Sequence, residues 1–241
     1  MTGLHILGRL LGASNHTFLA EDPSGEQWVY KPYAGERPLW DFPDGPLGRR
    51  EVAAYALSEH LGLGVVPETL WGEGEFGEGS LQRYIDGKVT DSVDVITPDA
   101  LTERWLPVAT GEDGQGNPVV LVHRDDTRLR RMALFDVICN NSDRKAGHLI
   151  ESKGRIFGVD HGVTFHVENK LRTVLWGFAG VPLDDEELAV AAAAASIEHA
   201  LSEGLHDDEW DAVRTRARGL LVDGTFPQPG TDWPSIPWPP F

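Results

Sequence analysis

The chain has 241 residues, a formal net charge of −17 at pH 7 and 41% hydrophobic residues. The charge repels nucleic acid and anionic lipid head groups at long range, so no nucleic-acid partner is expected. No apolar run reaches the roughly 18 residues of a membrane span, and the first residues lack the pattern of a signal peptide. Because Cys139 is the single cysteine, an internal disulfide and a cysteine-based zinc site are excluded, and a cytoplasmic protein fits best.

The first 85 residues are predicted to be rich in strands. Residues 4–33 contain three short apolar segments separated by polar turns, which predict three strands. A Pro- and Gly-rich loop over 34–48 precedes a helix, in which Val52 and Tyr55 share one face at helical spacing. Residues 65–86 then predict a hairpin with a turn of Gly and Glu.

The part of the chain after residue 86 is predicted to be mainly helical. The pattern is weak over 86–118, where a short helix near 99–108 is expected. Clearer helical spacing predicts helices over 124–141, 183–204 and 206–224. Residues 148–160 predict two short strands joined by a tight turn.

This order of elements predicts an α+β protein with two lobes. An antiparallel sheet with one helix would form an N-lobe over residues 1–85, and a mostly helical C-lobe would follow over 86–225. A tail rich in Pro and Trp, residues 226–241, is expected to be irregular and to pack its Trp side chains on the domain. Many α+β proteins share such an order, so the function has to be argued from the residues that carry chemistry.

Polar residues at the ends of the N-terminal strands are typical of a phosphate site. Ser14 and Asn15 stand at the tip of the first turn, where backbone N–H groups can reach phosphate oxygens. Lys31 ends an apolar strand, and Glu51 lies at the head of the next helix, where its carboxylate can hold the ammonium. The alternatives are an ordinary turn, a lysine that faces solvent and a glutamate that favours the first turn of a helix.

A second group of polar residues surrounds the short second hairpin. Antiparallel pairing would bring His148 and Asp160 together at its mouth. Asp160 suits a divalent metal that bridges to phosphates, His148 is a second ligand, and Asp143 is placed to orient an attacking hydroxyl and take its proton. Arg144 or Lys145 would neutralise the charge of a moving phosphoryl group.

Two other interpretations of this segment remain open. A loop rich in Asp and Asn, with helix caps and turns, needs no ligand. A zinc site formed by His148, His161 and His166 with Asp160 is the other candidate, although the chain has no HExxH spacing.

At these motifs the chain resembles the protein-kinase-like superfamily, on the atypical branch that holds phosphatidylinositol 3- and 4-kinases, HipA-type kinases and secretory-pathway kinases. More closely, it resembles actinobacterial proteins labelled phosphatidylinositol 3/4-kinase-like. The resemblance covers roughly residues 5–205. It rests on the motifs VYKP, REVAAYALSEHLGLGVVPET, SLQRYI, DVICNNSDRKAGHLI and GVDHG.

The resemblance implies a two-lobed protein-kinase-like fold, with ATP and Mg²⁺ or Mn²⁺ as cofactors. Lys31 would contact the α- and β-phosphates and pair with Glu51, Asp143 would be the catalytic base, and Asp160 would replace the metal-binding Asp of a DFG motif. A hinge at the adenine would consist of Gln82, Arg83, Tyr84 and Ile85. His148 stands where that branch commonly has Asn, and this softer ligand favours Mn²⁺.

The acceptor is expected to be a hydroxyl of a small metabolite or of a protein side chain. The segment over residues 161–178, after Asp160, contains only two cations, Lys170 and Arg172. A membrane lipid is therefore a poor candidate for the acceptor. Two alternatives stay open on the same scaffold. One is a pseudokinase that acts through a protein partner by its Pro- and Trp-rich tail, and the other is a nucleotidyltransferase that modifies a protein.

Overall fold

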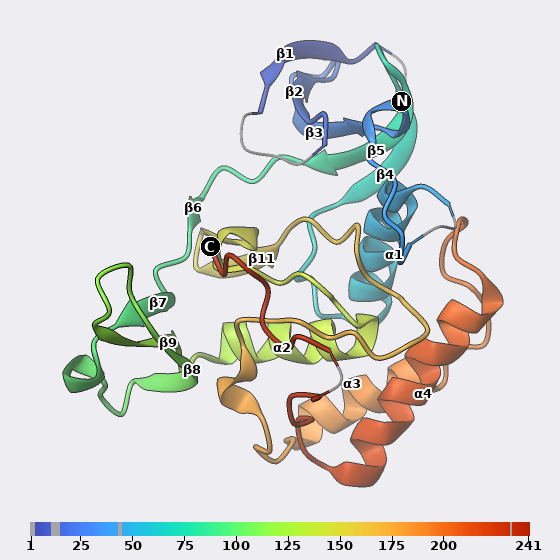
Figure 1. Ribbon diagram of the computed structural model, residues 1–241. Coiled ribbons are helices and arrows are strands. Elements are labelled where there is room, and N and C mark those ends of the chain that lie inside the picture. Colours follow the sequence, from blue (N-terminus) through green and yellow to red (C-terminus); the bar gives the residue numbers. More distant parts are fainter. Residues whose placement is uncertain (1–2, 11–14, 43–44, 232) are drawn as a thin grey trace.

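The computed structural model describes residues 3–10, 15–42, 45–231 and 233–241. Its N-terminal part is a five-stranded antiparallel sheet with the strand order β1-β2-β3-β5-β4 (Figure 1). The strands are β1 (His5–Arg9), β2 (Phe18–Glu21), β3 (Gln27–Pro32), β4 (Thr69–Gly74) and β5 (Gly77–Arg83). The three strands and the hairpin predicted for this part are confirmed.

β3 alternates between the two faces of the sheet. Trp28 and Tyr30 are buried in a small hydrophobic core together with Ala20 and Leu81. Because side chains in a strand alternate with a period of two, Lys31 lies on the opposite face, which is turned toward the rest of the molecule.

The helix α1 (Leu47–His60) connects this sheet to the C-terminal part. Its inner residues Ala53, Ala54 and Leu57 are fully buried in the main hydrophobic core, which continues into the C-terminal helices. The helix is therefore packed on both parts of the molecule, and its first turns lie close to the sheet (Figure 1).

A residue outside α1 caps its first turn. Pro46, which precedes the helix, offers no side-chain cap. The carboxylate of Glu36 accepts hydrogen bonds from Leu47 N and from Gly48 N, each at 2.8 Å. These bonds satisfy two of the four amides that every helix N-terminus leaves free, and they fix the loop before α1 to the helix.

The C-terminal part is built around α2 (Thr127–Cys139), α3 (Asp185–Ala195) and α4 (Asp207–Asp223). A small sheet of β6 (Lys88–Val89), β10 (Leu149–Ser152) and β11 (Arg155–Gly158) lies between α2 and the N-terminal sheet (Figure 1). Short 3-10 turns are η1 (Tyr33–Gly35), η3 (Ala146–His148) and η4 (Trp176–Phe178). The α+β architecture with a strand-rich N-terminal and a mainly helical C-terminal lobe is confirmed. None of the helices that the structure describes is both long and apolar enough to cross a membrane.

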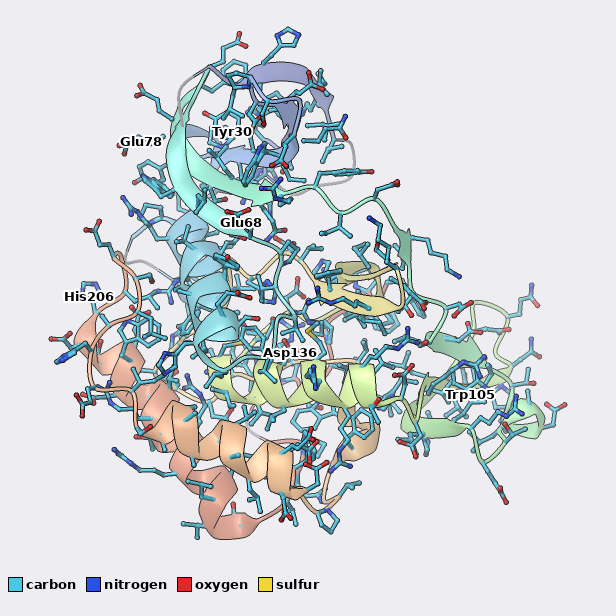
Figure 2. The ribbon with its side chains drawn as sticks, turned by 180° about the vertical axis from the view of Figure 1, so that it is seen from behind. Tyr30, Glu68, Glu78, Trp105, Asp136 and His206 are labelled. Carbon is cyan, nitrogen blue, oxygen red and sulfur yellow. The ribbon has the colours of Figure 1, made fainter. Side chains whose placement is uncertain are left out.

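The segment between residues 93 and 124 differs from the prediction. It forms a second three-stranded sheet from β7 (Val93–Ile96), β8 (Trp105–Glu112) and β9 (Pro118–Arg124), in the order β7-β9-β8. The helix predicted near 99–108 is wrong, since only the 3-10 turn η2 (Pro98–Ala100) forms and Trp105 begins β8 (Figure 2). Burial of the central strand and stacking of Arg124 over the Trp105 ring, at 4.4 Å, outweigh the weak local helical spacing.

α3 is shorter than the predicted helix over 183–204. It begins as expected, with a capping box in which Asp184 and Glu187 exchange hydrogen bonds. The helix ends at Ala195, after which Ile197 is buried and its carbonyl accepts a hydrogen bond from Arg214 of α4 at 3.2 Å. This long-range contact ends the helix earlier than the local pattern predicted.

The described residues of the tail, 226–231 and 233–241, are irregular, as predicted, and turn back across the C-terminal part. The expected packing of the tail Trp side chains is wrong for Trp238, which is 84% exposed. Ser235 O accepts hydrogen bonds from Thr173 N at 3.0 Å and from the indole nitrogen of Trp176 at 2.6 Å. Pro240 O accepts one from Ala146 N at 2.9 Å. The tail is thereby fixed beside the loop that follows α2 (Figure 1).

Candidate active site

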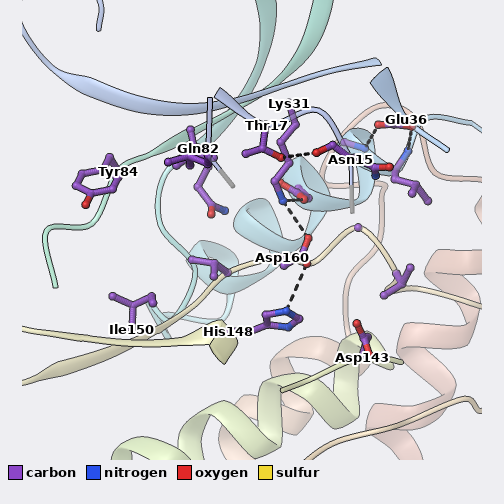
Figure 3. A pocket seen from close by; sticks show the side chains of 18 of the residues that line it. Asn15, Thr17, Lys31, Glu36, Gln82, Tyr84, Asp143, His148, Ile150 and Asp160 are labelled. Carbon is purple, nitrogen blue, oxygen red and sulfur yellow. Dashed lines mark hydrogen bonds and ion pairs between the residues drawn. The ribbon is translucent and has the colours of Figure 1, made fainter. Parts of the chain in front are cut away.

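A cavity of about 820 Å³ lies between the N-terminal sheet and the small hairpin β10–β11 (Figure 3). Its volume is within the range of small-molecule sites. The predicted site residues that line it are Asn15, Lys31, Glu51, Gln82, Arg83, Tyr84, Ile85, Asp143, Lys145, His148 and Asp160. Ser14 lies outside the described residues, and Arg144 does not line the cavity.

Lys31 is held between two carboxylates that come from different parts of the fold (Figure 3). Its ammonium nitrogen lies 2.5 Å from Oε1 of Glu51 on α1 and 3.0 Å from Oδ1 of Asp160, just after β11. The second oxygen of Glu51 accepts a hydrogen bond from Ser80 Oγ at 3.4 Å, on the strand that pairs with β3. The chain thus joins a strand lysine, a helix glutamate and a distant aspartate at one point.

The charges of Lys31, Glu51 and Asp160 shift one another's pKa values. Burial lowers the pKa of Lys31, but the charges of Asp160 and Glu51 outweigh this effect and raise the pKa above its ordinary value of 10.5. The ammonium in turn holds the pKa of the half-exposed Asp160 well below its ordinary 3.8. Burial raises the pKa of Glu51, an effect that Lys31 opposes. The site therefore presents a fixed ammonium and an ionised Asp160 at neutral pH.

His148 and Asp160 meet at the mouth of the hairpin, as the antiparallel pairing predicted. Nε2 of His148 lies 3.5 Å from Oδ2 of Asp160, and Val159 N donates to His148 O at 2.9 Å across the hairpin. Asp160 has a φ of 60°, a left-handed conformation that is uncommon for Asp and clusters at functional sites. Burial lowers the pKa of His148, although Asp160 raises it, so the imidazole is neutral near pH 7.

These two side chains fit a divalent metal that also binds phosphate. Neighbouring ligand atoms of an octahedral ion with bonds near 2.1 Å are about 3 Å apart. Nε2 of His148 and Oδ2 of Asp160, at 3.5 Å, are close to this separation. Nδ1 of His148 is buried, and within the described part of the chain it has no hydrogen-bond partner. Among the described residues, no three His, Cys, Asp or Glu side chains are grouped to hold a metal ion. Mg²⁺ in nucleotide sites needs only one or two protein carboxylates, because phosphates and water complete its shell.

The zinc alternative lacks a set of ligands in the described part of the chain. His161 is fully buried, and its Nε2 lies 2.7 Å from Nη2 of Arg144. His166 packs edge-on against the Phe42 ring, with the ring centres 5.3 Å apart. Neither ring joins His148 at the cavity.

Asp143 lies at the cavity on a loop after α2 that side-chain hydrogen bonds hold in place. Asn140 ends the helix in a left-handed conformation, and its side-chain amide donates to His166 O and to Glu168 O. Asp143 N donates to Oδ1 of Asn141 at 3.0 Å, which fixes the turn that carries the carboxylate. The helix thus ends at Cys139 with Asn140 as its cap, close to the end at residue 141 that the sequence predicted.

Lys145 lies beside Asp143 in the cavity. Its ammonium nitrogen is 3.1 Å from Oδ2 of Asp143, and both side chains remain partly exposed. A carboxylate and an ammonium are therefore adjacent, and Asp143 lies on the side of the cavity away from Lys31 (Figure 3).

Arg144 points into the interior instead of the cavity, which corrects the expectation that it meets a transferred group. Its guanidinium bonds both oxygens of Asp136, with Nε 2.9 Å from Oδ2 and Nη2 3.0 Å from Oδ1. It also donates to Val159 O at 3.0 Å. Arg144 and Asp136 have no exposed side-chain surface. Because Asp136 also accepts from the amide of Asn141 at 3.0 Å, this pair fixes the loop to α2 and to β11.

The predicted hinge begins with the last two residues of β5, Gln82 and Arg83, and continues with Tyr84 and Ile85 beyond the strand. Gln82 Nε2 donates to Thr69 Oγ1 at 2.9 Å, which keeps its side chain at the edge of the cavity. Arg83 N donates to Glu68 O at 2.7 Å, and Tyr84 N donates to Gln27 O of β3 at 2.9 Å. Within the described residues, the amide of Ile85 makes no such bond. This end of the cavity is also lined by the apolar side chains of Val29, Ile150 and Val159.

Glu36 and Arg37 line the cavity as well, and sequence reasoning missed them. The loop over residues 34–48 carried no signal beyond its Pro and Gly content. Burial raises the pKa of Glu36, although the amides of Gly48 and Leu47 stabilise its charge. Its role at the helix N-terminus depends on a turn of the loop that no local pattern predicts.

The paired lysine and glutamate, the cavity below the sheet and the aspartate-bearing hairpin together define a two-lobed, protein-kinase-like fold. No protein-family model matches the chain. Among curated proteins, Protein Rv2133c of Mycobacterium tuberculosis is 47% identical over an alignment of 257 positions, which covers 99% of this chain and 92% of the mycobacterial protein. The chain belongs to the family of this mycobacterial protein.

Solved structures give more remote likenesses. The Golgi casein kinase is 12% identical over 95% of this chain and 78% of its own, with a TM-score of 0.48. The Helicobacter pylori proinflammatory kinase CtkA is 10% identical over 92% of both chains, also with a TM-score of 0.48. At this distance the function has to be argued from the residues of the chain itself.

Proposed function

We propose that the chain is a metal-dependent phosphotransferase that moves the terminal phosphoryl group of ATP to a hydroxyl group of a small molecule or a protein. The observation that carries the proposal is the ammonium of Lys31, fixed between Glu51 and Asp160 at the wall of the cavity. Phosphoryl-transfer folds use such a lysine and glutamate to hold the inner phosphates, and an aspartate beside them to hold the metal.

The adenine would lie at the hinge end of the cavity. The amide of Ile85 makes no backbone hydrogen bond to the residues that the structure describes, so it is suited to donate to a ring nitrogen. Val29, Ile150 and Val159 would supply apolar surface for the two faces of the ring. Gln82 would limit the depth of the slot, because its side chain is held by Thr69.

The phosphates would lie along Lys31, with Asn15 at the end of the first turn above them. His148 and Asp160 would hold the divalent metal, which neutralises charge on the phosphates. The half-exposed carboxylate of Asp160 and the neutral imidazole of His148 are the forms in which these groups bind a metal.

Asp143 would accept the proton of the attacking hydroxyl as the oxygen–phosphorus bond forms and ADP leaves. Lys145, at 3.1 Å from Asp143, would meet the negative charge of the moving phosphoryl group. Arg144 would act only by fixing this loop, through its ion pair with Asp136.

We further propose the lobe boundaries given above: an N-lobe over residues 1–85, a C-lobe over 86–225 and a tail over 226–241. Membership of the phosphatidylinositol 3/4-kinase-like group and a cytoplasmic location stay predictions.

The proposal is tested by incubating the protein with ATP and Mn²⁺ or Mg²⁺, alone and with cell extract, and by identifying products by mass spectrometry. Addition of a phosphate, abolished in Asp160→Ala, is the expected result. Addition of an adenylate would assign nucleotidyl transfer instead. If no product forms while Asp160→Ala and wild type bind nucleotide equally well without metal, the chain acts as a pseudokinase.

A further inference from the structure

We infer that Arg50 is a positioning residue, whose buried ion pair with Glu209 holds α1, and with it Glu51, against the C-terminal part of the molecule. The inference rests on the proposed function, because Glu51 matters there as the partner of Lys31. Arg50 itself does not line the cavity and is not expected to touch a substrate.

Arg50 lies where four segments meet. Its Nη1 is 2.5 Å from Oε1 of Glu209 on α4, and the same atom donates to Thr164 O at 2.8 Å, in the segment after Asp160. The guanidinium carbon lies 4.9 Å from the centre of the Phe42 ring, in the loop before α1. The side chains of the ion pair are only 5% and 8% exposed. Water and salt screen so buried a pair weakly, and removing one partner leaves an uncompensated charge.

Arg50 and Glu51 are neighbours on α1, so their side chains point about 100° apart around the helix axis. Arg50 faces α4, whereas Glu51 faces Lys31 on β3. A rotation or outward shift of α1 that separates Glu51 from Lys31 therefore has to break the contacts of Arg50 as well.

The segment after Asp160 packs against the same turns of α1. A Cβ atom at Gly162 would lie 3.3 Å from Cβ of Leu47 and 3.8 Å from Oε1 of Glu51. This close approach brings the backbone beyond Asp160 next to the helix. Arg50 thus ties together the two segments that carry the partners of the cavity lysine.

The consequence is a lysine and glutamate pair that is assembled before any nucleotide arrives. If the ion pair of Arg50 is broken, the fraction of molecules with Glu51 in place falls, and the apparent Kd for nucleotide rises by the inverse of that fraction. A fall to about one tenth would raise the Kd about tenfold.

Two glutamates provide a matched test. Glu209→Gln removes the charge with little change of shape, and glutamine still supports the capping box in which Oε2 of Glu209 accepts from His206 N at 2.8 Å. Glu187 holds the same position in the capping box of α3, and its other oxygen pairs at 2.6 Å with Arg130 on α2. Neither Glu187 nor Arg130 lines the cavity, so Glu187→Gln is the control.

Two measurements separate positioning from stability. Titration with Mn²⁺ and a non-hydrolysable ATP analogue is expected to give a Kd about tenfold higher for Glu209→Gln and a wild-type Kd for Glu187→Gln, although both variants lower the Tm. Amide hydrogen exchange of the free protein is expected to accelerate in α1 and over residues 161–166 in Glu209→Gln but not in the control.

Wild-type affinity and wild-type exchange of α1 in Glu209→Gln, with a Tm lowered as in the control, would overturn the inference, because the ion pair would then only stabilise the fold. If the wild-type protein binds no nucleotide, the proposed function fails, and the exchange of α1 still decides whether Arg50 positions the helix.

Discussion

Replacing Lys31 by Met removes the cation that two carboxylates share, and its effect on stability should depend on pH. Glu51 is only 3% exposed, whereas Asp160 is 49% exposed. Loss of the ammonium leaves Glu51 as an unpaired buried charge, while Asp160 remains hydrated. We therefore expect nearly all of the loss to come from Glu51, at about 3 kcal/mol by the cost of breaking a buried pair. For a chain of this size the Tm would fall by roughly 6–12 °C.

The sign of the pH dependence follows from the pKa of Glu51. Burial raises this pKa above its ordinary 4.5 even beside Lys31, and removing the ammonium raises it further. A group with a raised folded pKa contributes stability below its unfolded pKa and loses it as pH rises through the folded pKa. The stability deficit of Lys31→Met should thus be small near pH 5 and reach its full size near pH 8.

The assay is urea unfolding followed by Trp fluorescence at pH 5 and pH 8, for wild type, Lys31→Met, Glu51→Gln and the double variant. In the double variant the buried charge is gone, so its deficit at pH 8 should be about 2 kcal/mol smaller than that of Lys31→Met. Equal deficits at both pH values, with no relief from Glu51→Gln, would refute the reasoning.

Three further variants test other parts of the site. Asp143→Asn should leave nucleotide affinity within about twofold of wild type and slow transfer by about 10²–10⁴-fold, the usual contribution of a general base, as read from product formation. Asp136→Asn should lower the free energy of unfolding by about 3 kcal/mol in urea titrations, because Arg144 then keeps a buried charge without its partner, and an unchanged midpoint would contradict the buried ion pair. His148→Asn should shift metal preference toward Mg²⁺, since an amide oxygen is harder than imidazole, and an unaltered ratio of nucleotide affinities with the two metals would remove His148 from the metal site.

The residues that meet at Lys31 could be brought together from the sequence because each stands near the end of an element with a clear pattern. Lys31 lies near the end of an apolar strand, and Glu51 lies in the second turn of the helix that follows. Asp160 comes two residues after β11, whose partner β10 begins directly after His148. Antiparallel pairing of two adjacent strands fixes their register, so the proximity of His148 and Asp160 was predictable and is confirmed at 3.5 Å.

Other features depend on contacts that no local pattern carries. The direction of the Arg144 side chain is set by Asp136, which lies inside α2. Among the described residues, Asp136 is the only salt-bridge partner of this guanidinium. The strand at Trp105 is set by burial of its partner β9. The ion pair of Arg50 joins helices that are far apart in the sequence, and the spacing of apolar residues in each helix says nothing about it.

The central claim, that a nucleotide binds between the lobes with its phosphates on Lys31, is tested most directly by a crystal structure with a non-hydrolysable ATP analogue and Mn²⁺. The account predicts adenine beside Ile85, phosphate oxygens within hydrogen-bond distance of Lys31, and Mn²⁺ on Asp160 with the terminal phosphate turned toward Asp143. Density for the nucleotide outside this cavity, or an empty cavity at saturating nucleotide, would contradict it.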